Sequence, residues 1–125
     1  HLIPYLDVRD NILAASLATG AGDEEMADKL LEHFGLTQRA RHVPAALSTG
    51  EKQRAAMARA LFNTPKLILA DEPTGNLDRD NAESLLKQLS SFTSDGGAVL
   101  LVTHDARVEE HADRTVEISE GRLVG

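Results

Sequence analysis

Two carboxylates stand side by side where an apolar segment of this sequence ends. Asp71 and Glu72 directly follow the run LILA. An unpaired charge at the end of a buried strand costs several kcal/mol of desolvation unless another group compensates it. A magnesium ion together with a phosphate chain would compensate it. The acid pair therefore predicts a site for a hydrated cation and a phosphorylated ligand.

A second polar group, His104 and Asp105, follows the apolar run AVLLVT. Ligand sites of α/β proteins lie outside the carboxyl ends of parallel strands. We therefore expect the acid pair and His104 to share one site. There Asp71 would hold Mg²⁺ through water, Glu72 would polarise an attacking water, and His104 would contact the transferred phosphate. The alternative interpretation makes the acids ordinary loop residues and the histidine a capping or packing side chain.

Helix caps form the second group of candidate residues. Ser48 and Glu51 have the spacing of a capping box, in which each side chain bonds the other residue's backbone N–H. The helix that they begin must end before Pro65. Asp78 is expected to cap a later helix. A purely structural interpretation, capping and nothing more, exists for each of these residues.

The elements that position these residues follow from hydrophobic periodicity. Residues 66–71 and 98–103 are short apolar runs, typical of parallel strands buried on both faces. The helix that follows Asp78 has one apolar face for the core. That face consists of Ala82, Leu85, Leu86, Leu89 and Phe92.

The last part of the chain continues the same alternation. We expect a short helix over 105–112, a third strand over 114–119 and a short return strand over 123–125. Strands and helices that alternate at this spacing predict βαβ units and a mostly parallel sheet.

Residues 1–46 read as a separate helical unit, and residues 47–125 as the α/β unit. We expect one helix over 8–18 and another over 24–34, which Asp23 caps and Gly35 follows.

Composition excludes several classes of protein. The 125 residues are enough for one packed domain, and 42% of them are hydrophobic. The net charge of −7 argues against general nucleic-acid binding, which requires a basic surface. Without cysteine, no disulfide or thiolate metal site can form. No apolar run approaches the roughly 18–20 residues that cross a membrane.

Four segments, in order, carry a resemblance to a known family. LSTGEKQRAAMARAL resembles the signature segment of the ATP-binding-cassette (ABC) transporter ATPases. LILADEP is similar to their Walker B strand, TGNLD to their D-loop, and LLVTHD to their switch-histidine segment. The subgroup that it most resembles contains lipoprotein-release and macrolide-export cassettes. The resemblance implies part of a P-loop NTPase (RecA-like) α/β core with an N-terminal helical subdomain.

The same resemblance implies a role for individual residues at the strand ends. Asp71 matches the magnesium ligand, Glu72 the catalytic base and His104 the switch histidine. ATP and Mg²⁺ are the implied cofactors.

The other matched residues lie at helix starts. Ser48, Thr49, Gly50 and Glu51 fall in the signature segment, whose Ser48 and Gly50 positions contact the γ-phosphate of ATP held by an opposite cassette. A helix N-terminus suits that task because its N–H groups and dipole attract anions. Asp78 matches the D-loop aspartate at the interface between two cassettes.

Two features depart from the family pattern. Thr49 stands where the family usually has glycine, and its β-branched side chain restricts close approach to a phosphate. The phosphate loop G-x-x-x-x-G-K-[ST] does not occur in the sequence. We therefore expect a C-terminal part of a cassette that binds ATP weakly and is inactive alone. Without the phosphate-loop strand, the strands at 98–103 and 114–119 would pair directly, exchange with a second copy, or leave the final hairpin loosely attached.

The implied function is ATP hydrolysis that powers membrane transport. The implied partners are a second cassette and a transmembrane permease subunit, with no nucleic acid. The implied location is cytoplasmic, on the inner face of the cell membrane. Two alternatives remain: a soluble ABC-type ATPase of translation or DNA repair, and an inactive remnant or interaction module.

Overall fold

The computed structural model describes residues 1–20 and 22–125. Its first part is helical, with two α-helices, each followed by 3₁₀ turns. These elements are α1 (Val8–Leu13), η1 (Ala14–Ala18), α2 (Glu24–His33), η2 (Thr37–Arg39) and η3 (Pro44–Ala46).

The helix expected over 8–18 divides into α1 and η1. The α1 segment buries Val8, Asn11 and Ile12, whereas η1 buries no residue. Most helical stability in proteins comes from packing an apolar face. Without such packing, the end of the helix takes the tighter 3₁₀ form.

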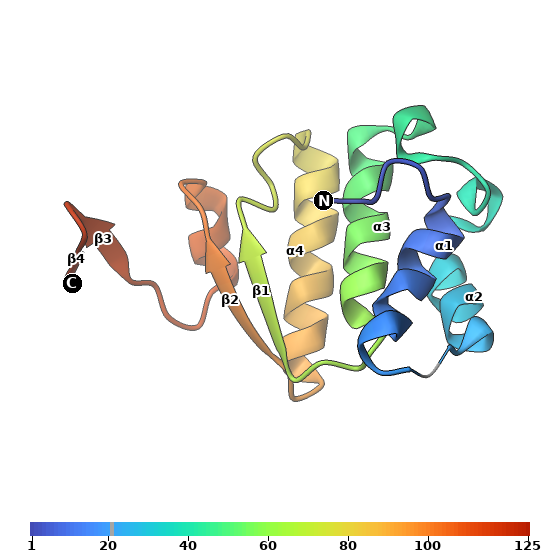
Figure 1. The fold of residues 1–125 in the computed structure, drawn as a ribbon. Helices are drawn as coiled ribbons and strands as arrows, with labels where there is room; N and C mark the ends of the chain where they lie inside the picture. Colours follow the sequence, from blue (N-terminus) through green and yellow to red (C-terminus); the bar gives the residue numbers. More distant parts are fainter. Residues whose placement is uncertain (21) are drawn as a thin grey trace.

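The second part alternates helices and strands, as the sequence predicts. Its elements are α3 (Thr49–Leu61), β1 (Leu67–Asp71), α4 (Arg79–Ser94), β2 (Ala98–Val102), η4 (Ala106–His111), β3 (Glu117–Ser119) and β4 (Arg122–Val124). Figure 1 shows α3 and α4 side by side between the helical part and the strands.

The β1 and β2 strands pair in parallel, with Asp71 opposite Val102 at the carboxyl end. The prediction that both faces are buried is wrong. The α4 helix covers only the face that contains Ile68, which is 6% exposed. Leu69 and Leu100, paired on the other face, are 70% and 61% exposed.

The final hairpin forms a sheet of its own. Only 117–119 of the expected third strand is extended, and it pairs antiparallel with 122–124. Glu120 and Gly121, with φ of 49° and 74°, make the tight turn that suits a twisted hairpin. Among the described residues, no strand joins this hairpin to β1 or β2. The prediction that 114–119 extends the parallel sheet is therefore wrong, and the strand does not pair directly with 98–102 either; the hairpin is a separate sheet.

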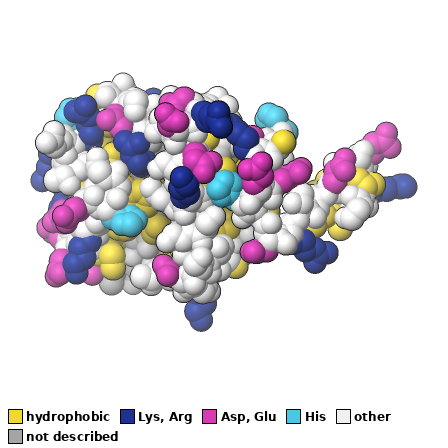
Figure 2. All heavy atoms as spheres, turned by 180° about the vertical axis from the view of Figure 1, so that it is seen from behind, with side chains coloured by type: hydrophobic (Ala, Val, Ile, Leu, Met, Phe, Trp, Pro, Cys, Tyr) yellow, Lys and Arg dark blue, Asp and Glu magenta, His cyan; other side chains and the backbone are white. Residues whose placement is uncertain are grey.

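Figure 2 shows the hairpin standing apart from the body, on whose surface acidic and basic side chains are interspersed. Within the body, one apolar cluster joins the helical part to α3. Members from the two parts include Val8, Ile12, Leu31, Ala55, Met57 and Ala58. The helical part therefore packs directly on the helix that begins at residue 49.

Candidate functional site

The predicted site residues lie toward one end of the molecule. Figure 1 shows the carboxyl ends of β1 and β2 at the same end as the starts of α3 and α4. Two groups of side chains form there. The strand-end cluster contains Glu72, Thr103 and His104, and the helix-start cluster contains Gly50, Arg54, Asp78 and Asn81.

Both loops that leave the parallel strands contribute to the strand-end cluster. The Glu72 carboxylate lies 2.6 Å from Nδ1 of His104 and accepts a hydrogen bond from the His104 backbone N–H at 3.1 Å. Its other oxygen accepts from the Thr103 hydroxyl at 2.8 Å. The sequence predicts that Glu72 and His104 meet, and the structure brings them together. Thr103 was missed, although its place between β2 and His104 could have indicated it.

The backbone of Glu72 is in the left-handed region, with φ of 44°. This conformation is uncommon for residues other than glycine and stores strain when the surroundings impose it. The backbone N–H still donates to the Val102 carbonyl at 2.8 Å, which extends the β1–β2 pairing by one residue. The chain therefore leaves the strand sharply at Glu72 and turns its carboxylate toward the next strand end.

The charge of Glu72 is stabilised locally. Hydrogen bonds from His104 and then Thr103 lower the pKa of the Glu72 carboxyl group. The His104 side chain is 87% exposed. The cluster therefore holds an ionised carboxylate beside an imidazole that solvent can reach.

Asp71 is the last residue of β1 and is exposed, and no side-chain hydrogen bond in the described residues joins it to Glu72 or His104. Within residues 1–20 and 22–125, its carboxylate has no hydrogen-bond partner, and no group of three or more acidic or histidine side chains is placed to hold a metal. Mg²⁺ in nucleotide sites usually binds one or two carboxylates, with phosphates and water completing its shell. One available carboxylate fits a cation that arrives with a phosphate chain.

A second layer supports the strand-end cluster. Thr74, which is buried, donates to the Asp105 carboxylate at 2.9 Å. Arg107 forms an ion pair with the same carboxylate at 2.6 Å and is the main cause of the lowered pKa of Asp105. The turn after β1 and the segment after β2 are thus joined twice, through Glu72 and through Asp105.

The predicted capping box at the start of α3 is confirmed. The Ser48 hydroxyl accepts from the Glu51 backbone N–H at 3.1 Å, and the Glu51 carboxylate accepts from the Ser48 N–H at 2.9 Å. Arg39 adds an ion pair to Glu51 at 3.1 Å. The backbone bond from Ser48, followed by Arg39, lowers the pKa of Glu51. Thr49 is exposed beside this cap, whereas Gly50 is buried.

Asp78 caps α4, as predicted, and accepts from the Asn81 backbone N–H at 2.9 Å. That bond is the main cause of its lowered pKa. The two clusters are connected through Gln53 on α3, whose side chain donates to the Pro73 carbonyl at 2.6 Å. The structure thus ties the start of α3 to the turn that carries Glu72.

Comparisons with known proteins agree with this arrangement. A family described as "ABC transporter" matches residues 1–75. The macrolide export ATP-binding/permease protein MacB of Wolinella succinogenes is 41% identical over 98% of this chain and 20% of its own length. The ABC transporter ATP-binding protein YknY of Bacillus subtilis is 40% identical over 99% of this chain and 55% of its own.

Solved structures give the same result. A dimeric post-hydrolysis state of the ATP-binding cassette MJ0796, bound to ADP and Pi, superposes with a TM-score of 0.87 at 34% identity. The match covers 98% of this chain and 56% of that chain. The chain belongs to the ABC transporter family. Its expected α/β P-loop NTPase fold class and its likeness to macrolide-export cassettes are confirmed.

The relatives compared are named as transporter ATP-binding proteins, which favours that likeness over a soluble ATPase of translation or DNA repair. In the described part of the chain, no helix has the length and apolar character needed to cross a membrane.

Proposed function

We propose that this chain supplies the catalytic carboxylate and the signature segment of an ATP-hydrolysing cassette that powers membrane transport. The observation that carries the proposal is the strand-end cluster. It places the Glu72 carboxylate 2.6 Å from the His104 imidazole, directly after Asp71 in the chain and at the same end as the capped start of α3. A general base, a contact for a phosphate and a cation ligand are the groups that phosphoryl transfer to water requires.

Each residue has a defined task in this proposal. Glu72 accepts the proton of the attacking water, and the hydrogen bonds from His104 and Thr103 hold its carboxylate in place for that task. His104 orients that water and contacts the transferred phosphate from the neighbouring strand end. Asp71 would hold Mg²⁺, which, when bound, neutralises charge on the phosphates.

The start of α3 has its task in an assembly of two cassettes. Ser48, Thr49, Gly50 and Glu51 lie at a helix N-terminus, where unpaired N–H groups and the helix dipole attract an anion. We propose that they contact the γ-phosphate of ATP bound by a second cassette, with Asp78 at the interface between the two. The dimeric cassette structure similar to this chain supports the arrangement.

The partner that uses the hydrolysis is proposed to be a transmembrane permease, with the cassette on the cytoplasmic face of the membrane. The name of the macrolide export relative combines ATP-binding and permease functions. The chain spans 20% of the macrolide export relative and 55% of YknY, so the activity, substrate and partners of the whole protein are part of this proposal.

The test replaces the proposed base in the intact protein that contains this chain. Glu72→Gln keeps the size of the side chain but removes its basicity, so ATP turnover should fall by about 10²- to 10⁴-fold while ATP still binds. Release of phosphate measures turnover, and a fluorescent ATP analogue measures binding. Glu110→Gln, a change at an exposed acid outside the cluster, should have no effect. Unchanged turnover in Glu72→Gln would remove Glu72 from the role of base.

A further inference from the structure

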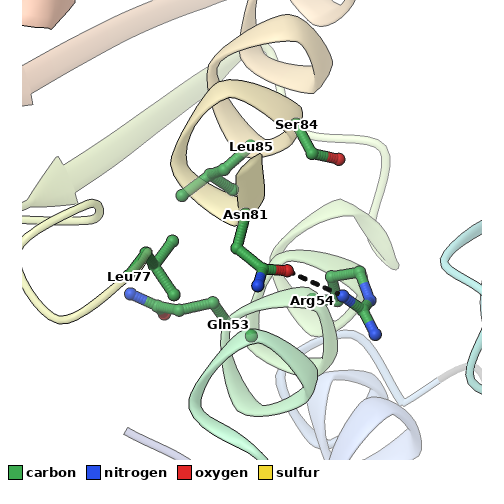
Figure 3. A pocket seen from close by; sticks show the side chains of 7 residues that line it. Gln53, Arg54, Leu77, Asn81, Ser84 and Leu85 are labelled. Atoms are coloured by element: carbon green, nitrogen blue, oxygen red, sulfur yellow. Dashed lines mark hydrogen bonds between the residues drawn. The ribbon is translucent and has the colours of Figure 1, made fainter. Parts of the chain in front are cut away.

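The side chain of Asn81 connects α4 to α3. Its Oδ1 accepts a hydrogen bond from Nη1 of Arg54 at 3.3 Å, and its Nδ2 donates to Oδ2 of Asp78 at 2.6 Å. Figure 3 shows Asn81 pointing from α4 toward Arg54. The guanidinium of α3 and the capping carboxylate of α4 are thus joined through one amide.

This connection requires a side chain at position 81 that both accepts and donates hydrogen bonds, as a carboxamide does. The guanidinium of Arg54 only donates hydrogen bonds, and the ionised Asp78 carboxylate only accepts them. The bridging side chain must therefore offer an acceptor to one and a donor to the other. An aspartate at 81 would face the Asp78 carboxylate with a second negative charge, and an aliphatic side chain would satisfy neither partner.

Gly50 lies against the same amide. A Cβ atom at residue 50 would fall 2.6 Å from Oδ1 and 2.8 Å from Cγ of Asn81, well inside contact distance. The amide is the end of a flexible side chain and can shift, but the shift strains its bonds to Arg54 and Asp78. The crevice around these side chains has a volume of about 10 Å³, too small for a ligand. The crevice is a contact at which side chains from the starts of α3 and α4 pack together.

We propose that Asn81 is a positioning residue that fixes the start of α3, with Ser48 and Gly50, relative to the Asp78 end of α4. The proposal rests on the proposed function, in which those two helix starts meet the ATP of a second cassette. It also assigns a reason for glycine at position 50, namely contact with Asn81 within the same chain. The alternative reason is that a bound phosphate needs close approach to the backbone of residue 50.

A double-mutant cycle in the intact protein separates these two reasons. Gly50→Ala should lower kcat by about 100-fold, because displacements of about 1 Å at a reacting site cost that much. Asn81→Ala should lower kcat by about 10-fold and change the KM for ATP by less than about twofold. Because the shorter side chain makes room for the new methyl group, the double variant should match Asn81→Ala and exceed Gly50→Ala by about 10-fold.

Additive losses, with the double variant at or below the kcat of Gly50→Ala, would overturn the proposal. Circular dichroism and the urea midpoint establish that each variant is folded. If Gly50→Ala does not fold, Asn81→Asp tests the proposal instead. It should lower kcat further than Asn81→Ala does. Equal kcat values for these two variants would overturn the proposal. Ser84→Ala, which changes another residue of the crevice outside the hydrogen-bonded chain, should leave kcat unchanged.

The proposed function can fail independently of this inference. Absence of ATP hydrolysis in the unaltered protein, or full activity of Glu72→Gln, would defeat the proposed function. Hydrolysis that depends on Glu72, combined with additive effects at 50 and 81, would defeat only the role of Asn81.

Discussion

Two isoleucines show that the two sheets of this molecule differ in how far their side chains are buried. Ile68 on β1 is 6% exposed and belongs to the apolar cluster. Ile118 on β3 is 68% exposed in a hairpin whose strand residues all face solvent. Both strands are regular and both are paired, so hydrogen bonding along the backbone does not distinguish them.

Burial of side chains is what differs. The β1–β2 pair packs against α4, whose Ala82, Leu85, Leu86 and Leu89 are buried. The β3–β4 pair contains three residues per strand, and no helix in the described part of the chain covers it. An isolated two-stranded hairpin has marginal stability in water. The stability of this chain therefore resides in the helices and the parallel pair, and the hairpin contributes little to the free energy of unfolding.

The largest expected effect comes from removing the buried isoleucine. Ile68→Ala should lower the free energy of unfolding by about 2–5 kcal/mol, because a cavity opens under α4. The same change at the exposed position, Ile118→Ala, should alter it by less than about 0.5 kcal/mol. Urea titration followed by circular dichroism measures both.

A loss above about 1 kcal/mol in Ile118→Ala would contradict the conclusion that the hairpin contributes little stability, because surface substitutions usually stay within ±0.5 kcal/mol. It would mean that the hairpin buries its apolar face against another surface in solution. Equal losses at both positions would show that α4 does not seal the inner face of the parallel pair.

A smaller effect is expected from the capping box of α3. Ser48→Ala removes the acceptor for the Glu51 N–H, and a lost N-cap costs about 0.5–2 kcal/mol. Thr49→Ala, a change at the next residue and outside the cap bond, should stay within about 0.5 kcal/mol. Thermal unfolding measures both variants, and equal midpoints for them would show that the cap does not stabilise α3.

The smallest effect is the dependence of stability on pH. Contacts with Arg107 lower the pKa of Asp105, and contacts with His104 lower the pKa of Glu72, so both carboxylates bind protons more readily in the unfolded chain. Their contribution is present above the unfolded pKa values of about 4 and is lost as the pH falls toward the folded values. The urea midpoint should therefore decline below about pH 4.

Asp105→Asn provides the matched comparison. It should lower the urea midpoint at pH 7, because the Arg107 pair is lost, and it should flatten the decline in acid. If the urea midpoint of Asp105→Asn declines in acid as steeply as that of the unaltered chain, groups other than Asp105 cause the loss of stability at low pH.

Local signals predicted the fold well where one residue decides the structure. Ser48 and Asp78 begin helices through cap bonds, and both caps are confirmed. The strands at 67–71 and 98–102 pair in parallel, which places the ends of both strands together, as expected. These features depend on short-range chemistry that a sequence displays directly.

Features that depend on distant contacts were not predictable. The sequence predicted that Glu72 and His104 meet, but not the positive φ of Glu72 or its bond from Thr103, which arise at the junction of two loops. The role of Asn81 depends on Arg54 and Gly50, which lie at least 27 positions away in sequence. Apolar runs also did not reveal that Leu69 and Leu100 face solvent, because hydrophobicity does not indicate which helix covers a strand.

The bond between Gln53 and the Pro73 carbonyl has a mechanical consequence. The ring of proline fixes φ of Pro73, but it leaves free the rotation that orients the Pro73 carbonyl. The hydrogen bond from Gln53 is therefore what fixes the direction of this carbonyl, and it does so from α3. One side-chain amide thus sets a backbone orientation that the turn would not impose by itself.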